Sequence, residues 1–239
     1  MKILITGATS GIGEQVARDY AEQGHDVIVC GRNQTKLDQL AEFTNLTSLR
    51  FDVTDRAQCR QALQSVSGLD LVILSAGVCE YIDDAQHFDA ELVERVFSAN
   101  FFGMLNCAES LLPNMQSGSR MLFIDSMSRL LPFTRAQAYG ASKAATYYFA
   151  KSLAVDLKPK GIQVVTASPG FVKTPMTDAN DFPMPMRISV SEASAALRQQ
   201  LDKGRSTIYF PRRFGWALRF IHKLPTALQL RIAQRLKDN

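Results

Sequence analysis

The sequence has no apolar run long enough to cross a membrane. Among its 239 residues, no continuous apolar stretch reaches the ~18 residues that a membrane-spanning helix needs. The first expected strand begins at Lys2, which leaves no room for a signal peptide before it. No internal repeat or low-complexity segment is visible. With 46% hydrophobic residues, we expect one globular domain with one large core, located in the cytoplasm.

Cysteine is scarce, and its spacing predicts neither disulfide bonds nor a metal site. Cys30, Cys59, Cys79 and Cys107 show no close pairing and no metal-ligand spacing, which suits a reducing compartment. Cys79 follows residues 75–77 and could lie near a bound cofactor, although a buried, inert thiol is the simpler interpretation.

What the sequence does contain is a regular alternation of strand-like and helix-like segments. The strand-like segments are 2–6, 26–30, 47–51, 70–74, 119–125, 162–167 and 206–210. Helical patterns cover 12–23, 34–43, 56–65, 89–114, 136–158 and 191–203. This alternation predicts an α/β fold, a doubly wound parallel sheet with helices on both faces. Ligands of such sheets bind beyond the carboxyl ends of the strands.

The first strand leads into a glycine-rich turn and then a helix. In the turn, residues 7–13, Gly7 permits a tight bend and Gly11 lets the backbone approach a pyrophosphate. Gly13 lets the helix pack closely on the strand. The free N–H groups at the helix start would face the phosphates. The segment predicts a Rossmann-like dinucleotide-binding motif; an ordinary strand–turn–helix with three incidental glycines is the alternative.

Tyr139 and Lys143 lie at i and i+4 of a helical segment, so they share one face of the helix. A free tyrosine titrates near ~10, and a neighbouring ammonium favours the phenolate and lowers that pKa. Ser126 ends a strand-like run, where its hydroxyl could meet this pair. Ser128 is a rival for that role. Taken alone, the pair is also compatible with a surface lysine beside a half-buried tyrosine.

The order and spacing of several motifs resemble the short-chain dehydrogenase/reductase family over about residues 1–210. The motifs are Thr6-Gly7-x-x-x-Gly11-x-Gly13, Asp52-Val53, Ser75-Ala76-Gly77, Asn100, Ser126, Tyr139-x-x-x-Lys143 and Pro169-Gly170. The glycine spacing is similar to that of the compact oxidoreductase branch rather than the sugar-nucleotide epimerase branch. The resemblance implies a single NAD(P)-binding Rossmann domain, which we assign to residues 1–239; the basic amphipathic extension at about 212–239 is predicted from its own charge and spacing.

The resemblance also implies interconversion of a carbonyl and an alcohol, with the hydride carried by the nicotinamide. Ser126 would hydrogen-bond the substrate oxygen, and Tyr139 would act as general acid in reduction or base in oxidation. Lys143 would bind the nicotinamide ribose and lower the pKa of Tyr139. Asn100 would hold a water of the proton relay, helped by a local distortion of its helix near Gly103; a helix–helix hydrogen bond is its simpler role.

The residues after the second strand bear on the choice of cofactor. An acidic residue there would bind the ribose hydroxyls of NAD, but this chain has Gly31-Arg32. A guanidinium can bind a 2′-phosphate with paired donors, so we predict NADP(H) in preference to NAD(H), unless Arg32 is simply solvated at a helix start. By resemblance, Asp52 would contact the adenine amino group, with Val53 against the ring. The implied cofactor-binding residues are Gly7, Thr9, Ser10, Gly11, Ile12, Gly13, Arg32, Asp52, Val53, Ala76, Gly77, Tyr139, Lys143, Pro169, Gly170, Val172 and Thr174.

Two positions depart from the family pattern. Leu74 and Ser75 stand where two asparagines are frequent, which alters the polar wall beside the nicotinamide. Arg129 stands where a small residue is common after the serine. Its charge could select acidic substrates at the mouth of the pocket, or it could point to water.

The segment after Pro169-Gly170 is expected to shape the substrate pocket. Thr174 would, by resemblance, reach the nicotinamide carboxamide. Residues 177–189 look like a mobile lid that includes Phe182, Met184 and Met186. Because methionines suit adaptable apolar surfaces, we expect an apolar ketone or aldehyde as substrate.

The C-terminal segment differs in charge from the rest of the chain. Residues 203–239 hold nine basic residues against one acidic, a net charge of +8, whereas residues 1–202 hold 18 against 22, a net charge of −4. Trp216, Phe220, Leu224 and Leu228 recur at helical spacing between these charges, which predicts one or two amphipathic helices from about Arg212. Their apolar face could lie on an anionic membrane or pack on another subunit.

Three classes of function remain open from the sequence. The first is an NADPH-dependent carbonyl reductase acting on a small molecule as a homo-oligomer, a dimer or tetramer. The second is a cofactor-binding regulator without turnover, against which the intact set of Asn, Ser, Tyr and Lys argues. The third is a membrane-surface or assembly protein whose C-terminal segment is the active part. We expect neither a metal nor a nucleic-acid partner.

Overall fold

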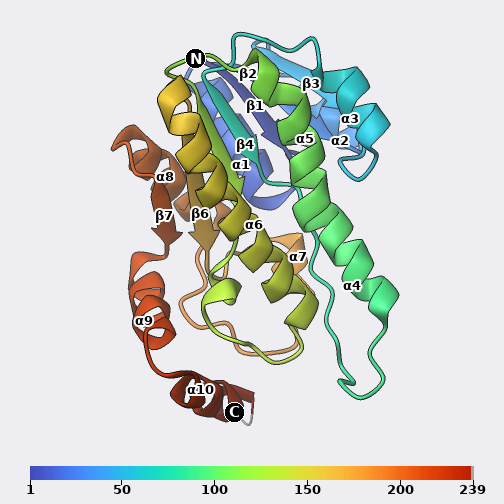
Figure 1. Cartoon of the computed structure of the whole chain (residues 1–239). Helices are drawn as coiled ribbons and strands as arrows, with labels where there is room; N and C mark the ends of the chain where they lie inside the picture. The colour runs from blue at the N-terminus through green and yellow to red at the C-terminus, as the bar shows by residue number, and fades with distance from the viewer. Residues whose placement is uncertain (238–239) are drawn as a thin grey trace.

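The computed structural model describes residues 1–237 and forms a parallel seven-stranded sheet covered by helices on both faces (Figure 1). The strands are β1 (Lys2–Thr6), β2 (Asp26–Gly31), β3 (Leu46–Arg50), β4 (Leu71–Leu74), β5 (Arg120–Ile124), β6 (Gln163–Pro169) and β7 (Thr207–Phe210). Their order across the sheet is β3-β2-β1-β4-β5-β6-β7, so the direction of winding reverses between β1 and β4. The predicted doubly wound fold is confirmed.

The helices follow the predicted segments closely. They are α1 (Gly11–Glu22), α2 (Gln34–Leu40), α3 (Arg56–Leu63), α4 (Ala90–Phe97), α5 (Gly103–Leu111), α6 (Gln137–Leu157), α7 (Pro175–Asp178), α8 (Val190–Asp202), α9 (Arg212–His222) and α10 (Thr226–Lys237). The segment predicted as one helix over 89–114 is instead α4 and α5 joined by a π-helical turn, Ser98–Phe102. The irregularity expected around Asn100 is therefore confirmed.

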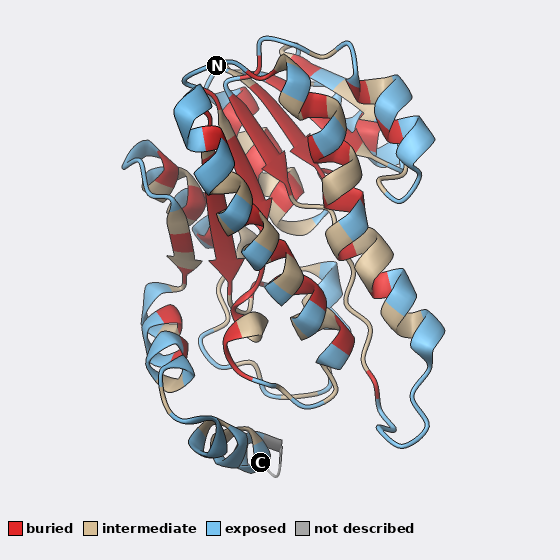
Figure 2. Ribbon diagram, in the orientation of Figure 1, coloured by how far each residue is buried: buried red, intermediate tan, exposed pale blue. Residues whose placement is uncertain are grey.

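Alternate residues of each strand face opposite sides of the sheet and build two hydrophobic cores. On one side, Ile3, Ile5 and Val165 pack with α1, α2 and α8. On the other side, Leu4 and Phe123 pack with α3, α5 and α6. Figure 2 shows the central strands buried from end to end. Burial on both faces explains why the strand sequences are almost continuously apolar.

Short polar side chains begin several of these helices, and α1 is an exception. Asn33 accepts a hydrogen bond from a backbone N–H of α2, Asp55 from two of α3, and Asp89 from one of α4. Ser10, the residue before α1, makes no such side-chain bond. The N-terminus of α1 therefore keeps its N–H groups available at the carboxyl end of β1.

The two C-terminal helices form an arm beside the sheet, as Figure 1 shows. Leu218 of α9 is buried with Met127 and Leu130, which belong to the 3₁₀ turn Met127–Leu130 after β5. The Nδ1 atom of His222 lies 2.9 Å from the Leu130 carbonyl oxygen. Helices α9 and α10 lie where amphipathic helices were predicted, but the buried face contains Leu218 rather than the predicted Trp216 and Phe220, and it packs on the chain's own domain. Within residues 1–237, no helix has the length and apolar character needed to cross a bilayer.

The contact of α1 with the turn that precedes it gives a testable prediction. A Cβ atom on Gly13 would lie 2.4 Å from the Gly7 carbonyl oxygen, which belongs to the backbone and cannot rotate away. Gly13→Ala should therefore lower the free energy of unfolding by about 1–3 kcal/mol through overpacking. Gly140→Ala is the matched control, because its nearest neighbour would lie at 3.5 Å. Urea unfolding of both variants measures the effect; equal stabilities would contradict it.

Candidate functional site

The carboxyl ends of β1 and β4 meet at the point where the winding reverses, and a polar contact joins them. The Thr6 hydroxyl accepts hydrogen bonds from the backbone N–H groups of Ser75 (3.2 Å) and Ala76 (3.4 Å). Gly7 has a φ of +66°, and a Cβ there would lie 2.7 Å from Ala76. Glycine is thus required both for the backbone conformation and for the close approach. The glycine-rich turn and residues 75–77 line one edge, as the sequence predicted.

A buried lysine lies behind this edge. Lys143 is 3% exposed, and its Nζ donates to the Ile124 carbonyl at the end of β5 over 3.0 Å. Burial lowers the pKa of Lys143 to about 8, while Asp125 and Cys79 act to raise it. A Cβ on Gly77 would lie 3.4 Å from this Nζ, so the glycine leaves the ammonium open towards the cofactor edge.

Asn100, within the π-helical turn, ties three segments of the site together. Its Oδ1 accepts from the Val78 N–H at 2.7 Å, and its Nδ2 donates to the Val78 carbonyl at 2.9 Å. The same Nδ2 donates to the Ser142 hydroxyl of α6 at 3.0 Å. The hydroxyl of Thr146, one turn further along α6, donates to the Asn100 carbonyl at 3.2 Å. A π turn is a common device at functional sites, and here it aligns α6 with residues 77–78.

Tyr139 and Ser126 meet, as the spacing predicted. The hydroxyl of Ser126 hydrogen-bonds Tyr139 and also accepts from the Ser128 N–H at 3.1 Å. The Ser128 hydroxyl is buried and has no hydrogen-bond partner among the described residues, so it is Ser126 that reaches the tyrosine. One expectation is corrected. Burial raises the pKa of Tyr139, so the net shift is opposite to the one expected from the neighbouring lysine; Cys79 also acts to raise it, and a hydrogen bond from Ser126 acts to lower it.

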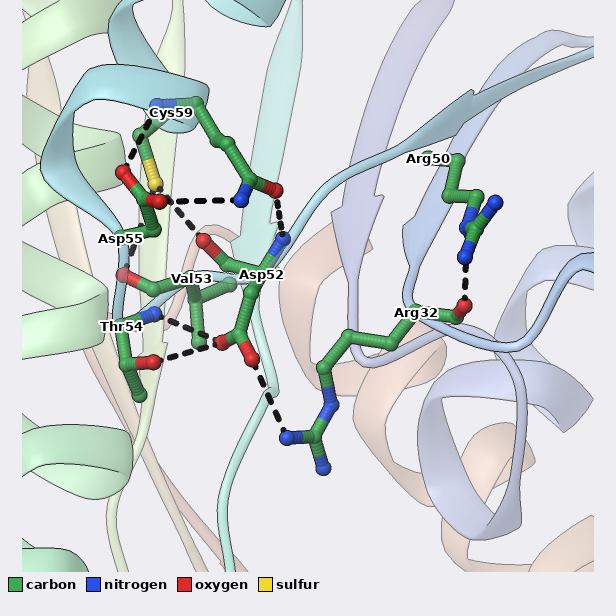
Figure 3. Close-up of polar contacts among 8 residues, drawn as sticks. Arg32, Arg50, Asp52, Val53, Thr54, Asp55 and Cys59 are labelled. Atoms are coloured by element: carbon green, nitrogen blue, oxygen red, sulfur yellow. Dashed lines mark hydrogen bonds and ion pairs between the residues drawn. The ribbon is translucent and has the colours of Figure 1, made fainter.

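The adenosine end of the candidate site lies at the ends of β2 and β3 (Figure 3). Arg32 donates from Nη1 to Asp52 Oδ2 over 3.2 Å. Partial burial acts to raise the pKa of Asp52, but hydrogen bonds from Thr54 and the guanidinium of Arg32 hold it below its usual value. Arg50, which the sequence analysis missed, donates from Nε to the Arg32 carbonyl at 3.3 Å. Arg50 could have been found from the register of β2 and β3, which pairs it with Gly31, the residue before Arg32.

The backbone around this edge fits a dinucleotide. Gly11 has a φ of +57°, and a Cβ on it would lie 3.0 Å from the Thr174 methyl group. A Cβ on Gly31 would lie 2.6 Å from the Thr9 methyl group. With the uncapped start of α1, these glycines leave an open cradle of N–H groups suited to phosphates. Residues 9–13, 31–32, 52–53, 76–77 and 174 would hold such a cofactor.

The remaining predicted cofactor residues lie around this cradle. Ile12 is half-buried against the core at the start of α1, and Val53 packs against Gly103 at the start of α5. Pro169 ends β6, and Gly170 donates its N–H to the Phe210 carbonyl over 2.8 Å. Val172 is buried and pairs with Ile188 in an isolated bridge, which fixes one end of the predicted lid.

The predicted lid lies across the substrate side and is held by several contacts. The Tyr81 hydroxyl donates to Asn180 Oδ1 at 2.9 Å, and the Tyr81 and Phe182 rings meet edge to face at 5.6 Å. Phe182 also lies 6.3 Å from the Phe171 ring. Arg135 pairs with Asp181 of the lid at 2.7 Å. Aromatic rings from Tyr81, Phe171 and Phe182 thus meet along the lid.

A buried ion pair lies directly behind the serine and corrects both expectations for Arg129. Its Nε lies 3.2 Å from Asp125 Oδ2, and the two side chains are 7% and 0% exposed. The guanidinium stacks over the Tyr147 ring at 3.4 Å and donates to the Tyr209 hydroxyl of β7 at 2.9 Å. Arg129 therefore neither lines the pocket mouth nor points to water. Burial raises the pKa of Asp125 to about 7, although Arg129, Ser168 and Lys143 all act to lower it.

This arrangement predicts a pH effect. Above pH 7 the Asp125 carboxylate is charged and stabilises the Lys143 ammonium, whose pKa is about 8. Asp125→Asn removes that support, so the Lys143 pKa should fall further. If the charged lysine is the active form, the alkaline limb of the kcat/KM profile should then move to lower pH. Ser128→Ala, which leaves the carboxylate and its contacts in place because the Ser128 hydroxyl has no hydrogen-bond partner among the described residues, is the control.

The result is read from pH–rate profiles of reduction. Asp125→Asn/Arg129→Gln gives a second variant in which Arg129 is not left as an unpaired buried charge, which guards against unfolding of the single variant. An alkaline limb that stays in place in both variants would show that Asp125 does not tune Lys143.

Known proteins resemble this chain both in sequence and in structure. A family model described as short chain dehydrogenase matches residues 1–182. An uncharacterized oxidoreductase of Myxococcus xanthus (strain DK1622) is 30% identical over 245 residues, which cover 98% of this chain and 96% of the relative. An NADP-dependent 3-hydroxy acid dehydrogenase of Escherichia coli (strain K12) is 31% identical over 180 residues, covering 72% of this chain and 73% of that protein.

Solved structures give the same picture. The closed form of a serine dehydrogenase complexed with NADP⁺ superposes with a TM-score of 0.80 at 26% identity, covering 88% of this chain and 94% of that one. A short chain dehydrogenase from Burkholderia cenocepacia J2315 in complex with NADP superposes with a TM-score of 0.86 at 22% identity, covering 96% of both chains. The second likeness shows the fold alone.

Proposed function

The chain belongs to the short-chain dehydrogenase/reductase family of oxidoreductases, and from this premise we propose that it interconverts a carbonyl and an alcohol on a small, apolar substrate with NADP(H). The observation that carries the proposal is the meeting of Ser126, Tyr139 and Lys143 at one edge of the sheet. A hydroxyl donor, a phenol and a buried ammonium are the groups that proton transfer to a carbonyl oxygen requires.

Each residue of the site has a separate role in proton transfer. The nicotinamide supplies the hydride when it is bound. The Ser126 hydroxyl orients the substrate oxygen, and the Tyr139 phenol, which burial keeps protonated at neutral pH, donates its proton to that oxygen in reduction. The Lys143 ammonium, held on the Ile124 carbonyl, stabilises the phenolate that remains. Asn100 positions α6, which carries both Tyr139 and Lys143.

The lining of the substrate side supports an apolar substrate. The Tyr81 and Phe171 rings each contact the ring of Phe182 in the lid. Burial raises the pKa of Tyr81, so its hydroxyl stays neutral. Arg129, which could have selected an acidic substrate, is engaged with Asp125 instead. A neutral ketone or aldehyde is the substrate class that this surface suits.

Two arginines support NADP(H) as the cofactor. Arg32 and Arg50 lie next to each other at the ends of the adjacent strands β2 and β3, where a 2′-phosphate would accept hydrogen bonds from both guanidinium groups. The E. coli relative is named as NADP-dependent, and the serine dehydrogenase neighbour is complexed with NADP⁺. Further parts of the proposal are a cytoplasmic location and a homo-oligomeric state. A regulator without turnover remains the alternative, and it is distinguished by the kinetics below.

Replacing the general acid tests the function directly. A panel of ketones and aldehydes screened for NADPH consumption should identify a substrate. Tyr139→Phe should then lower turnover by about 10²–10⁴-fold, because it removes the acid, while NADPH affinity stays within a few-fold. Tyr148→Phe, which removes the hydroxyl of a tyrosine of α6 that is 79% exposed, is the matched control. More than a tenth of wild-type turnover in Tyr139→Phe, with chemistry rate-limiting, would show that another group is the acid; no turnover with any substrate would favour the regulator.

Cofactor preference gives a second test. Arg32→Gln should weaken NADPH binding by roughly 10–150-fold, the range for a lost charge-assisted hydrogen bond, and leave NADH binding nearly unchanged. Arg50→Gln should act in the same direction, whereas Lys36→Gln, an exposed cation of α2, should have no effect. Introducing an acid by Gly31→Asp requires Thr9→Ser in the same chain, because the Thr9 methyl group occupies the space. Calorimetric titration of both cofactors decides; equal dissociation constants in the wild type would contradict the preference.

A further inference from the structure

Helix α9 has two different apolar faces, and only one of them is covered. Leu218 is buried and Phe214 is half-buried, and both pack in the cluster that contains Met127 and Leu130. On the other side, Trp216 is 75% exposed and Phe220 is 68% exposed. These two residues are at i and i+4, so their rings lie side by side along the helix.

The exposed rings are surrounded by positive charge. Arg212 lies one turn before Trp216, and Lys223 lies one turn after Phe220 on the same face of α9. Between Lys203 and Lys237 the sequence contains nine basic residues and no acidic one. Within residues 1–237, no ion pair involves Arg212, Arg213 or Lys223. The face therefore combines exposed aromatic area with cations that have no carboxylate partner within residues 1–237.

We propose that this face of α9 docks the protein on an anionic lipid surface, with Trp216 and Phe220 inserted among the headgroups. The Trp216 indole, an apolar ring with one N–H donor, suits the boundary between headgroups and acyl chains, and the Phe220 ring adds apolar area beside it. Lysine and arginine side chains beside them reach lipid phosphates. The proposal concerns where the protein works and does not depend on the reaction proposed above.

A second copy of the chain is a poorer occupant of this face. A two-fold interface places the same surface on both partners, so α9 would meet α9. Arg212 and Lys223 would then face like charges, with no acidic residue in the segment to neutralise them. An anionic bilayer presents the opposite charge together with an apolar interior.

The docking face continues into the lid of the candidate site. Met186, Arg212, Arg213 and Trp216 line one shallow hollow between the lid and α9. Met186 is 54% exposed at its edge. A protein docked through Trp216 would therefore hold this end of the lid at the lipid surface.

The chain offers an internal probe, since Trp216 is its only tryptophan. Titration with vesicles of phosphatidylglycerol and phosphatidylcholine should shift its emission to shorter wavelength, and pure phosphatidylcholine vesicles should do so far less. Brominated lipids should quench the emission. Phe220→Ala should weaken vesicle binding by roughly tenfold, and Arg212→Glu by roughly fivefold or more, with binding also weakened at high salt. Tyr148→Ala, which removes an aromatic residue of α6 that is 79% exposed, should bind as the wild type does.

Circular dichroism and thermal unfolding of each variant establish that it is folded before binding is compared. The absence of both a spectral shift and co-sedimentation with phosphatidylglycerol vesicles would overturn the proposal. So would a shift that appears without lipid as protein concentration rises, together with an increase in mass, because a second copy would then cover the face. A shift produced by a single-stranded oligonucleotide but not by vesicles would also overturn it and assign the surface to nucleic acid.

Discussion

Taking the Lys143 ammonium out of water is the constraint around which the site is arranged. A buried charge is tolerated only where polar groups replace its hydration. The Ile124 carbonyl accepts from its Nζ, and the Asp125 carboxylate acts to raise its pKa against the effect of burial. The buried Asp125 carboxylate is paired with Arg129, and the Arg129 guanidinium donates a hydrogen bond to the Tyr209 hydroxyl of β7. A charge required at the centre of the sheet thus determines polar contacts out to its last strand.

Strands, glycine turn and the serine–tyrosine–lysine group could be predicted because each depends on local pattern or on fixed spacing. The placement of Arg129 could not, since its partner Tyr209 is 80 residues away in sequence. The predicted shift of the Tyr139 pKa was wrong in direction. A spacing of four residues indicates a neighbouring cation, but it does not indicate that the phenol is buried, and burial raises the pKa. Arg50 was missed because only the register of β2 and β3 brings it beside Arg32.

The C-terminal helices show a second limit of prediction from sequence. Their amphipathic pattern predicted a covered apolar face, but a periodic pattern does not say what covers it. Leu218 and His222 pack on the 3₁₀ turn that follows Ser126, so α9 supports the segment that carries the serine. The same helix contacts the substrate side, since the Phe214 ring lies 5.7 Å from Phe171. The basic extension is therefore structurally part of the site region rather than an appendage to it.

The π turn at Ser98–Phe102 has a consequence for how this chain can vary in length. A π turn accommodates one residue more than the α-helical path would, so the helix after it is rotated by roughly 100° relative to an uninterrupted one. In this orientation α5 buries Met104, Cys107 and Leu111. Removing a single residue from the turn would restore a regular helix and turn these side chains out of the core. Insertions and deletions should accordingly be excluded from this segment, even though it lies in the middle of an otherwise ordinary helix.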